Sequence, residues 1–369
     1  MHNKINDLKN YLKNKYKERD EIIDALFVSV VARQHMLLIG PPGTAKSALI
    51  VDFVKSFVDM KYFQWLLTRY STPEELFGPV SLAELEKGVY KRNVADKLPE
   101  AQLTFLDEIF KSSSAILNAL LTIINERLFY NDGSPIKTPL ISVIGGSNEY
   151  PEEGEGLEAL FDRFLIRFEV EYIGEDANFF SMLKSDTQYI APPSPLNLTE
   201  LTQLQMLADM VDVPDDVLNT LVKIRTELRT EGIRPSDRRF RQSLSIIKAK
   251  AALDSRSVVQ VKDLAILKDG LWETVDQKDR VVDIVNQYAA DKCGMDLERI
   301  IKTSTEVYNS VQNDPTSENG MEATSKFKVM IKELKSLETQ YPERSDEIEI
   351  VQKKIMSAQS NISDLLLGV

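Results

Sequence analysis

The chain has 369 residues, of which 43% are hydrophobic and 28% are charged, and its formal net charge at pH 7 is −12. This composition is typical of a globular protein with room for two or three domains, and the negative charge argues against generalised binding to nucleic acid. The single cysteine, Cys293, cannot form an internal disulfide, and two histidines add too few ligands for a structural zinc site.

The N-terminal stretch "MHNKINDLKNYLKNKYKERDEII" is polar and contains no apolar signal core. No apolar run elsewhere approaches the ~20 residues of a membrane span. We therefore expect a cytoplasmic protein. Residues 1–17 predict a short helix, and the periodicity of residues 19–32 predicts an amphipathic helix that leads into the first strand.

Short apolar stretches then alternate with helical patterns. The strand candidates are 36–39, 62–67, 102–106, 140–144 and 165–170. This alternation predicts an α/β fold in which helices cover a parallel sheet. Three connections carry signals of their own: "STPEELFG" (71–78) has a helix start, 127–140 predicts a β-hairpin around Asn131-Asp132-Gly133, and the long segment 78–101 has room for a small hairpin.

The strand pattern stops at about residue 185, where a proline-rich linker (185–200) begins. Residues 198–275 are helical in pattern, and so is the lysine- and glutamate-rich remainder. We therefore expect three parts: an α/β core over 1–185, an all-α domain over 186–275 and a helical C-terminal region over 276–369. A helical hairpin is predicted around "QYPERSDE" (340–347). Intramolecular packing is the favoured role of this hairpin, and docking of a partner is the alternative.

The stretch "GPPGTAKS" (40–47) joins the first strand to a helix and matches the phosphate-binding pattern G-x-x-x-x-G-K-[ST] except at Ala45. Backbone N–H groups of residues 43–45 can surround a phosphate at the start of the helix. Lys46 can reach the β- and γ-phosphates, and Ser47 can supply a hydroxyl to Mg²⁺. Alanine at position 45 adds only one methyl group, so we interpret the stretch as an ATP site and not as a simple turn.

Two acids follow another buried strand in "LTFLDEIF" (103–110). Asp107 can hold the Mg²⁺ shell, and Glu108 can act as a general base on the attacking water. A strand end with two solvated acids is the alternative. The phosphate loop some 60 residues upstream makes the catalytic interpretation the stronger one.

Polar side chains also end the later strands. Asn148 in "VIGGSNEY" (143–150) can bind the attacking water or the γ-phosphate, although a turn-forming asparagine is the better explanation of this residue taken alone. Arg163 and Arg167 in "ALFDRFLIRFEV" (159–170) can stabilise a transferring phosphoryl group, including one in a neighbouring subunit. An ordinary salt bridge to Asp162 is the alternative.

The order of these features resembles that of the AAA+ ATPases. The stretches "GPPGTAKS", "STPEELFGP", "LPEA", "FLDE", "ILNALLTIINER", "SNE" and "LFDRFLIR" look like the MoxR branch, and among its members they are most similar to RavA-type regulatory ATPases. Alanine is common at the sixth loop position of that branch. The resemblance covers residues 10–185 and continues through "PSDRRF" (235–240) to "LAILKDGLW" (264–272).

The resemblance implies which residues form the site. Glu108, Asn148, Arg163 and Arg238 would be catalytic, and Mg²⁺ would be held at Ser47 and Asp107. Arg238, with Arg239 as the alternative, matches an arginine that reaches the phosphates from the helical lid. The nucleotide itself would be bound by Gly40, Pro42, Gly43, Thr44, Ala45, Lys46, Ser47, Ala48 and Arg238.

The resemblance also implies an assembly and a role. Family members form ATP-driven rings, usually hexamers, with sites between subunits, and they remodel partner proteins, often together with a von Willebrand factor A-domain protein. Segment 78–101 matches an insertion hairpin that faces the ring pore, and residues 17–19 lie where family members cover the adenine. The resemblance fades after about residue 276, and the β-rich domain of RavA has no counterpart in this sequence.

Two other functions stay open. A DNA-remodelling motor is the first, because residues 223–250 are strongly basic, although no aromatic stacking platform accompanies them. A nucleotide-sensing scaffold without turnover is the second. It predicts that Glu108 or the arginines are missing, and they are present.

Overall fold

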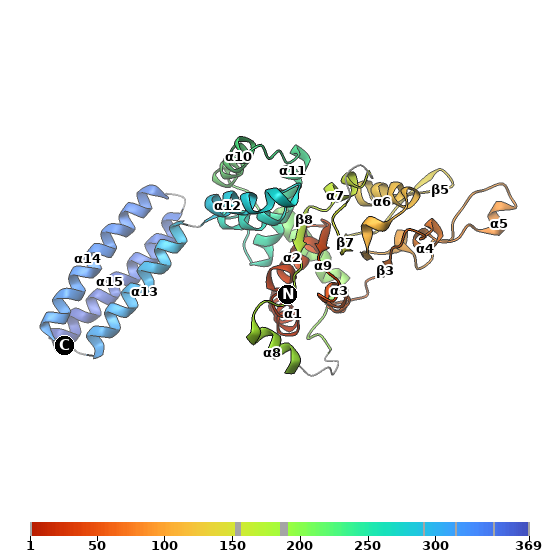
Figure 1. Ribbon diagram of the computed structural model, residues 1–369. Coiled ribbons are helices and arrows are strands. Elements are labelled where there is room, and N and C mark those ends of the chain that lie inside the picture. Colours follow the sequence, from red (N-terminus) through yellow and green to blue (C-terminus); the bar gives the residue numbers. More distant parts are fainter. Residues whose placement is uncertain are drawn as a thin grey trace. The chain divides into compact units, whose positions relative to one another are not determined.

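The computed structural model describes residues 2–151, 156–184, 191–290, 292–313, 316–341 and 344–367. The chain forms two compact units, Met1–Ala289 and Ala290–Val369 (Figure 1). The predicted linker at 185–200 lies partly outside the described residues.

A five-stranded parallel sheet forms the centre of the first unit, in the order β3-β4-β7-β1-β8. Its strands are β1 (Met36–Ile39), β3 (Tyr62–Leu66), β4 (Leu103–Asp107), β7 (Ser142–Ser147) and β8 (Ile166–Glu169). All five were predicted from their apolar runs. β1 and β7 are buried along their whole length, as expected for strands covered on both faces. A short pair, β2 (Phe57–Val58) with β9 (Leu196–Asn197), was not predicted.

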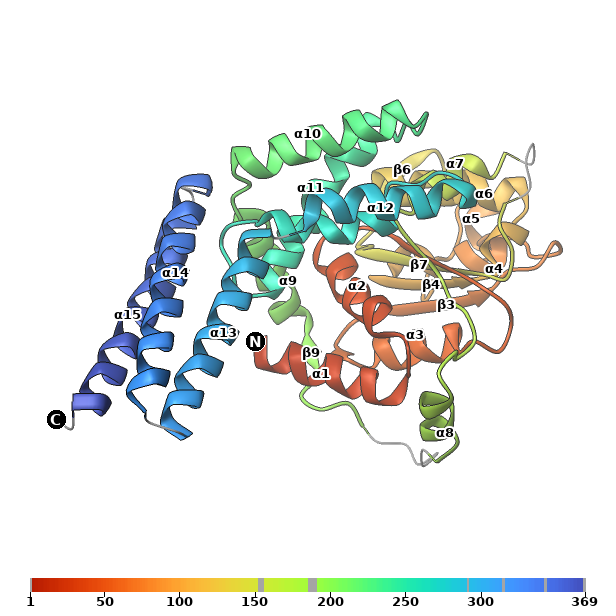
Figure 2. The same cartoon turned by 60° about the vertical axis from the view of Figure 1, so that its left-hand side comes forward.

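Helices lie on both sides of this sheet, so the predicted α/β architecture is confirmed. In Figure 2 α3 (Lys46–Val54) is on one side, and α6 (Ser114–Glu126) and α7 (Glu158–Arg163) are on the other. The other helical segments of this part are α1 (His2–Lys15), α2 (Asp20–Val31), α4 (Pro73–Phe77), α5 (Leu82–Leu85), η1 (Leu98–Glu100), η2 (Ile109–Lys111) and α8 (Asp176–Lys184). A capping box of Thr72 and Glu75 starts α4, as predicted.

The two predicted hairpins differ in outcome. Strands β5 (Leu128–Asn131) and β6 (Ser134–Lys137) form the antiparallel hairpin expected at 127–140. Segment 78–101 instead contains the single turn of α5 and one isolated antiparallel bridge, between Val80 and Arg92. The arms of this segment are joined by backbone hydrogen bonds from Ser81 N to Lys91 O and from Asn93 N to Pro79 O, which form a minimal antiparallel pairing. The amides of Tyr90 and Arg92 also donate to side chains of the β5–β6 turn.

The all-α part comprises α9 (Leu198–Met210), α10 (Asp215–Thr230), α11 (Asp237–Leu253), η3 (Val261–Asp269), η4 (Val275–Gln277) and α12 (Lys278–Ala289). The sequence assigned α12 to the C-terminal region, which was expected to begin at residue 276. In the structure α12 packs against α10 and η3, and the chain divides after Ala289. Helical periodicity shows that Val281, Ile284 and Val285 form a buried face, but not which neighbour covers them.

The second unit is a bundle of three helices, α13 (Lys292–Asn313), α14 (Ser317–Gln340) and α15 (Ser345–Leu367), each of which contacts the other two. Helices α14 and α15 form the predicted hairpin, and α13 adds a third helix. The apolar positions singled out in the sequence, among them Leu334, Ile348 and Ile355, lie in the core of this bundle. No helix in the described part of the chain combines the length and apolarity needed to cross a membrane.

Candidate active site

The phosphate loop occupies residues 40–45, between the end of β1 and the start of α3. A Cβ atom on Gly40 would lie 2.1 Å from the carbonyl oxygen of Val170, so only glycine fits there. Ala45 has a left-handed backbone with φ of 64°. A methyl group in that conformation costs roughly 1–2 kcal/mol. The sequence shows that a methyl group fits at this position, but not the left-handed backbone conformation that usually selects glycine.

Lys46 begins α3 and directs its side chain back into the loop. Its Nζ donates to the carbonyl oxygens of Gly40 at 2.5 Å and Pro41 at 3.0 Å, and to Asn148 Oδ1 at 2.9 Å. Burial lowers the pKa of Lys46, and the nearby carboxylates of Asp107 and Glu108 oppose this shift. The ammonium group therefore sits where loop carbonyls converge, on acceptors that phosphate oxygens can replace.

Ser47 and Asp107 face each other across the loop, as the Mg²⁺ prediction requires. Ser47 Oγ donates to Asp107 Oδ2 at 2.7 Å. A Cβ on Gly146 would come within 2.6 Å of Asp107 Oδ1, so the glycine in β7 makes room for this carboxylate. The described residues contain no cluster of three His, Cys, Asp or Glu side chains that would hold a metal alone. One carboxylate and one hydroxyl suit Mg²⁺, which keeps waters and binds substrate phosphates as well.

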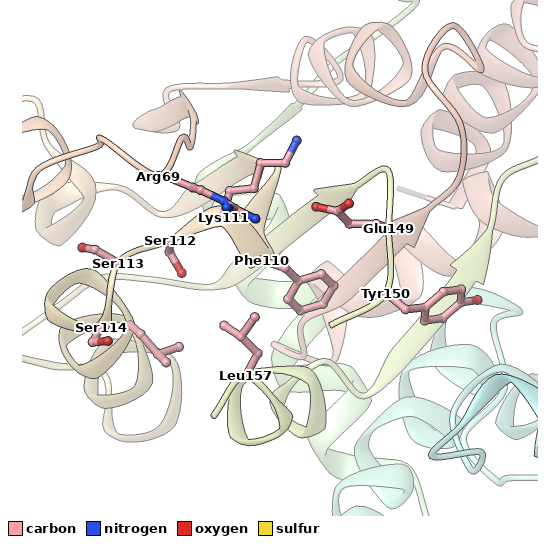
Figure 3. A pocket seen from close by; sticks show the side chains of 10 residues that line it. Arg69, Phe110, Lys111, Ser112, Ser113, Ser114, Glu149, Tyr150 and Leu157 are labelled. Carbon is pink, nitrogen blue, oxygen red and sulfur yellow. The ribbon is translucent and has the colours of Figure 1, made fainter. Parts of the chain in front are cut away.

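Glu108 and Asn148 meet at the ends of β4 and β7. Asn148 Nδ2 donates to Glu108 Oε1, and its Oδ1 accepts from Lys46. Glu108 is buried, has a left-handed φ of 54°, and has Lys111 Nζ 3.2 Å from Oε2, outside hydrogen-bond geometry. Asn148 therefore connects the phosphate-loop lysine to the glutamate. A cavity of about 360 Å³ opens beside these residues and is lined by Lys111, Arg69 and Glu149 among others (Figure 3).

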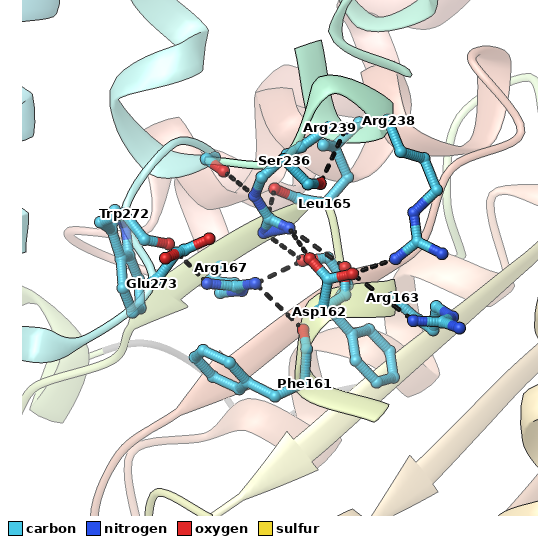
Figure 4. A network of polar contacts seen from close by, with 12 residues as sticks. Phe161, Asp162, Arg163, Leu165, Arg167, Ser236, Arg238, Arg239, Trp272 and Glu273 are labelled. Carbon is cyan, nitrogen blue, oxygen red and sulfur yellow. Dashed lines mark hydrogen bonds and ion pairs between the residues drawn. The ribbon is translucent and has the colours of Figure 1, made fainter. Parts of the chain in front are cut away.

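Arg163 and Arg238 lie together at a different place. Both donate to the carboxylate of Asp162: Arg163 Nη1 at 3.4 Å and Arg238 Nη2 at a shorter distance (Figure 4). The side chain of Arg238 is 41% exposed. The structure thus brings these two predicted arginines together. Arg163 also forms the ion pair with Asp162 that was the alternative interpretation of this residue.

Arg167 and Arg239 are buried beside them and bind backbone carbonyls. Arg239 donates to Gly270, Asp162 and Phe164, and Arg167 donates to Trp272, Phe161 and Phe164 (Figure 4). Burial lowers the pKa of Arg239 to about 10. These two guanidinium groups connect the end of α7 to the segment that follows η3. Their donors are engaged, so Arg238 is the member of the Arg238–Arg239 pair with an accessible guanidinium.

The residues around the phosphate loop and the arginines around Asp162 lie at opposite ends of the strands of the sheet. β1 and β8 run in parallel, with Met36 beside Ile166 and Ile39 beside Glu169. Lys46 follows the end of β1, whereas Arg163 precedes the start of β8. Four residues of strand, roughly 13 Å, separate the edges. Arg163 is therefore distant from Lys46 of its own chain, as expected. Arg238 lies with Arg163 and pairs with Asp162, and its predicted contact with a nucleotide phosphate stays a prediction.

Residues near the loop complete the site. Tyr172, which the sequence analysis did not single out, donates its hydroxyl to the Pro42 carbonyl oxygen at 3.1 Å. The Glu18 carboxylate accepts from the amides of Gly174 and Glu175 and from the Asn178 side chain, which fixes the start of α8. The proposed adenine contact of residues 17–19 stays a prediction. The role of Gly146 was also not predicted, since it depends on Asp107, a neighbour far away in the sequence.

The chain is similar in sequence to several known proteins and domains. Residues 3–209 match the model of the MoxR domain in the MoxR-vWA-beta-propeller ternary systems, and residues 216–285 match an AAA lid domain. An uncharacterized protein of Methanocaldococcus jannaschii is 40% identical over 307 residues, which cover 82% of this chain and 79% of the relative. The chaperone MoxR1 of Mycobacterium tuberculosis is 25% identical over 165 residues, 42% of this chain and 41% of its own.

One solved structure extends the comparison to the fold. A crystal structure from Cytophaga hutchinsonii, provisionally described as an ATPase, matches with a TM-score of 0.63 at 17% identity. The match covers 78% of this chain and 93% of that chain. At this identity the likeness concerns the fold alone.

The neighbouring arginines Arg238 and Arg239 are expected to respond differently to substitution. Arg239→Met leaves several buried carbonyls without a donor and should lower the free energy of unfolding by at least about 3 kcal/mol. Arg238→Met removes an exposed ion pair and should change it by less than about 1 kcal/mol. Urea unfolding followed by circular dichroism measures both. Equal losses from the two variants would contradict the assignment of Arg239 as the structural arginine.

Proposed function

The chain belongs to the MoxR family of AAA+ ATPases, and on that premise we propose that it hydrolyses ATP to ADP and phosphate, with Mg²⁺, at sites shared between neighbouring copies in a ring. The observation that carries the proposal is the polar chain from Lys46 through Asn148 to Glu108. It joins the group that binds phosphate to the group that activates water.

Each residue of the site has one role in the proposed reaction. The loop amides and Lys46 bind the phosphates, and Ser47 and Asp107 hold Mg²⁺, which would neutralise phosphate charge when bound. Glu108 takes a proton from the attacking water, and Asn148 orients the carboxylate that does so. Burial of Lys46 and Glu108 supports this assignment, because charge–charge interactions are stronger where water is excluded.

Arg163 and Arg238 act on the nucleotide of the next copy. The distance of one strand between Arg163 and the phosphate loop supports this division, because a guanidinium at the opposite edge cannot reach the phosphates of its own subunit. The side chain of Arg163 is 22% exposed, so part of it is accessible to a neighbouring copy. In a closed ring every copy shares such an interface with its neighbour, and we expect six copies in the ring.

The work done by hydrolysis is remodelling of a partner protein in the cytoplasm. The matched MoxR domain is described from ternary systems with vWA and β-propeller proteins, and the MoxR1 relative is described as a chaperone. We infer a von Willebrand factor A-domain protein as the partner and a regulatory role of the RavA type. Two basic residues of α10–α11 do not face a DNA partner freely, since Arg225 pairs with Asp237 at 2.8 Å and Arg239 is buried, and the chain as a whole is acidic.

Binding and turnover are expected to separate in two single variants. Lys46→Ala should abolish ATP binding, because it removes the cation at the phosphates. Glu108→Gln should keep the affinity within a few-fold and slow turnover by about 10²-fold or more, since the amide cannot accept the proton. Calorimetric ATP titration and a phosphate-release assay test both. Near-normal affinity in the lysine variant, or an unchanged rate in the glutamine variant, would remove that residue from its role.

Mixing two inactive variants tests the shared site. Arg163→Ala should bind ATP normally but hydrolyse it at least about 10³-fold more slowly. When this variant is co-assembled with Lys46→Ala, some interfaces combine an intact Lys46 with an intact Arg163, so part of the activity should return. Each variant alone contains no such interface and serves as the control. A mixture that stays inactive despite shown co-assembly contradicts the proposal.

The class of partner is tested with the Glu108→Gln variant as bait, because it should hold ATP and remain bound to its target. We expect it to retain proteins, a vWA-domain protein among them, in the presence of ATP. The Lys46→Ala bait should retain none of them. Capture of DNA alone, with hydrolysis that rises on adding DNA, would favour the motor over the remodeller.

A further inference from the structure

Asp162 provides the one carboxylate that three arginines contact. Its Oδ2 accepts from Arg238 Nη2 and, at 3.4 Å, from Arg163 Nη1. Its Oδ1 lies 3.5 Å from Arg239 Nη1. Figure 4 shows Asp162 at the centre of this group, with the three guanidinium groups pointing toward it from α7 and α11. Glu273 adds a second negative charge near Arg239, so Asp162 is the carboxylate that faces the guanidinium groups of Arg163 and Arg238.

The excess positive charge is unfavourable without a further anion. Two guanidinium groups about 4 Å apart repel by roughly 1 kcal/mol in water and by about 4 kcal/mol near a protein surface. Burial, with the charge of Arg238 next, lowers the pKa of Arg163. Among the described residues, neither Arg163 nor Arg238 contacts any carboxylate other than Asp162.

The space around the pair is also cationic. Arg163 and Arg238 line a cavity of about 400 Å³ together with Arg33 and Arg127. The other two arginines are already committed. Arg33 binds Asp209 through both of its terminal nitrogens, and Arg127 donates to backbone carbonyls. Arg163 and Arg238 are therefore the arginines of this cavity that share one acceptor atom.

We propose that Asp162 is a positioning residue that holds Arg163 of the core and Arg238 of the lid together as a two-arginine clamp for one anion. The inference rests on the proposed function, in which that anion is the terminal phosphate of the nucleotide on the next copy. Arg238 lies 76 positions beyond Asp162 in the chain, and the shared Oδ2 atom joins it to Arg163. Phosphate can bridge the same two guanidinium groups with more charge and more acceptor oxygens.

Asp162 positions the arginines and does not inhibit them, because it is itself fixed. Its carbonyl oxygen accepts from the buried Arg239 at 3.1 Å, and it lies in the last turn of α7. Its side chain is 32% exposed, so a phosphate can approach the guanidinium groups while the carboxylate stays in place. A carboxylate that only blocked the arginines would slow the reaction, and removing it would speed turnover.

Asp162→Asn tests this role. We expect kcat to fall by about 10²-fold, the usual cost of a small misplacement of catalytic groups, with ATP affinity unchanged. Asp237→Asn is the matched control. Asp237 lies beside Arg238 in the lid helix α11, its side chain is 84% exposed, and it pairs with Arg225. It should hydrolyse ATP at the parent rate. If Asp162→Asn melts at a lower temperature, Asp162→Glu keeps the charge and should recover part of the rate. Unchanged or faster turnover in Asp162→Asn overturns the proposal.

Mixed assemblies show on which side of the interface Asp162 acts. Asp162→Asn mixed with Lys46→Ala should regain activity, because each variant repairs the other's defect. Asp162→Asn mixed with Arg163→Ala should stay inactive, because neither copy offers an intact clamp. The opposite pattern would assign Asp162 to the nucleotide side and overturn the inference alone. Failure of the Lys46→Ala and Arg163→Ala mixture would instead overturn the shared site itself.

Discussion

The five strands of the central sheet run in the same direction, so all their carboxyl ends lie on one side of the first unit and all their amino ends on the other. We call these two sides the carboxyl edge and the amino edge. The carboxyl ends of β1, β4 and β7 bring the phosphate loop, Glu108 and Asn148 to one edge. The turn before β8 presents Arg163 at the other. Residues at opposite edges of one sheet cannot act on one phosphate, because a strand length separates them. A second copy of the chain can bring the two edges together, which is why the proposed reaction depends on assembly.

Strained backbone and close packing both occur at the carboxyl ends of the strands, where the phosphate loop lies. Ala45 and Glu108 both have left-handed backbones although neither is glycine, at a cost of about 1–3 kcal/mol each. Glycines are used where no alternative exists: Gly40 touches a carbonyl of the next strand, and Gly146 touches the Asp107 carboxylate. The fold thereby fixes the orientation of Glu108 before any ligand binds. Rigid placement of this kind is what transition-state stabilisation requires.

Much of this arrangement could be predicted from the sequence, because it depends on local patterns. Strands of four to six apolar residues end in glycine, acids or asparagine, and parallel pairing brings those ends to one edge. Other features depend on tertiary neighbours. Arg238 and Arg239 are adjacent in the sequence, and only the packing of α11 decides which is buried. The role of Gly146 requires the register of β7 against β4. The clamp at Asp162 requires the position of the lid on the core.

The contact between an arginine and the nucleotide of another copy is the central claim, and its most direct test is a cryo-electron microscopy structure of the ATP-bound Glu108→Gln assembly. The account predicts guanidinium nitrogens of Arg163 and Arg238 from the neighbouring copy at about 3 Å from the terminal phosphate oxygens. It also predicts that Lys46 of the nucleotide's own chain contacts the same phosphate. A terminal phosphate bound only by its own chain, with Arg163 of every copy remote from it, would contradict the account.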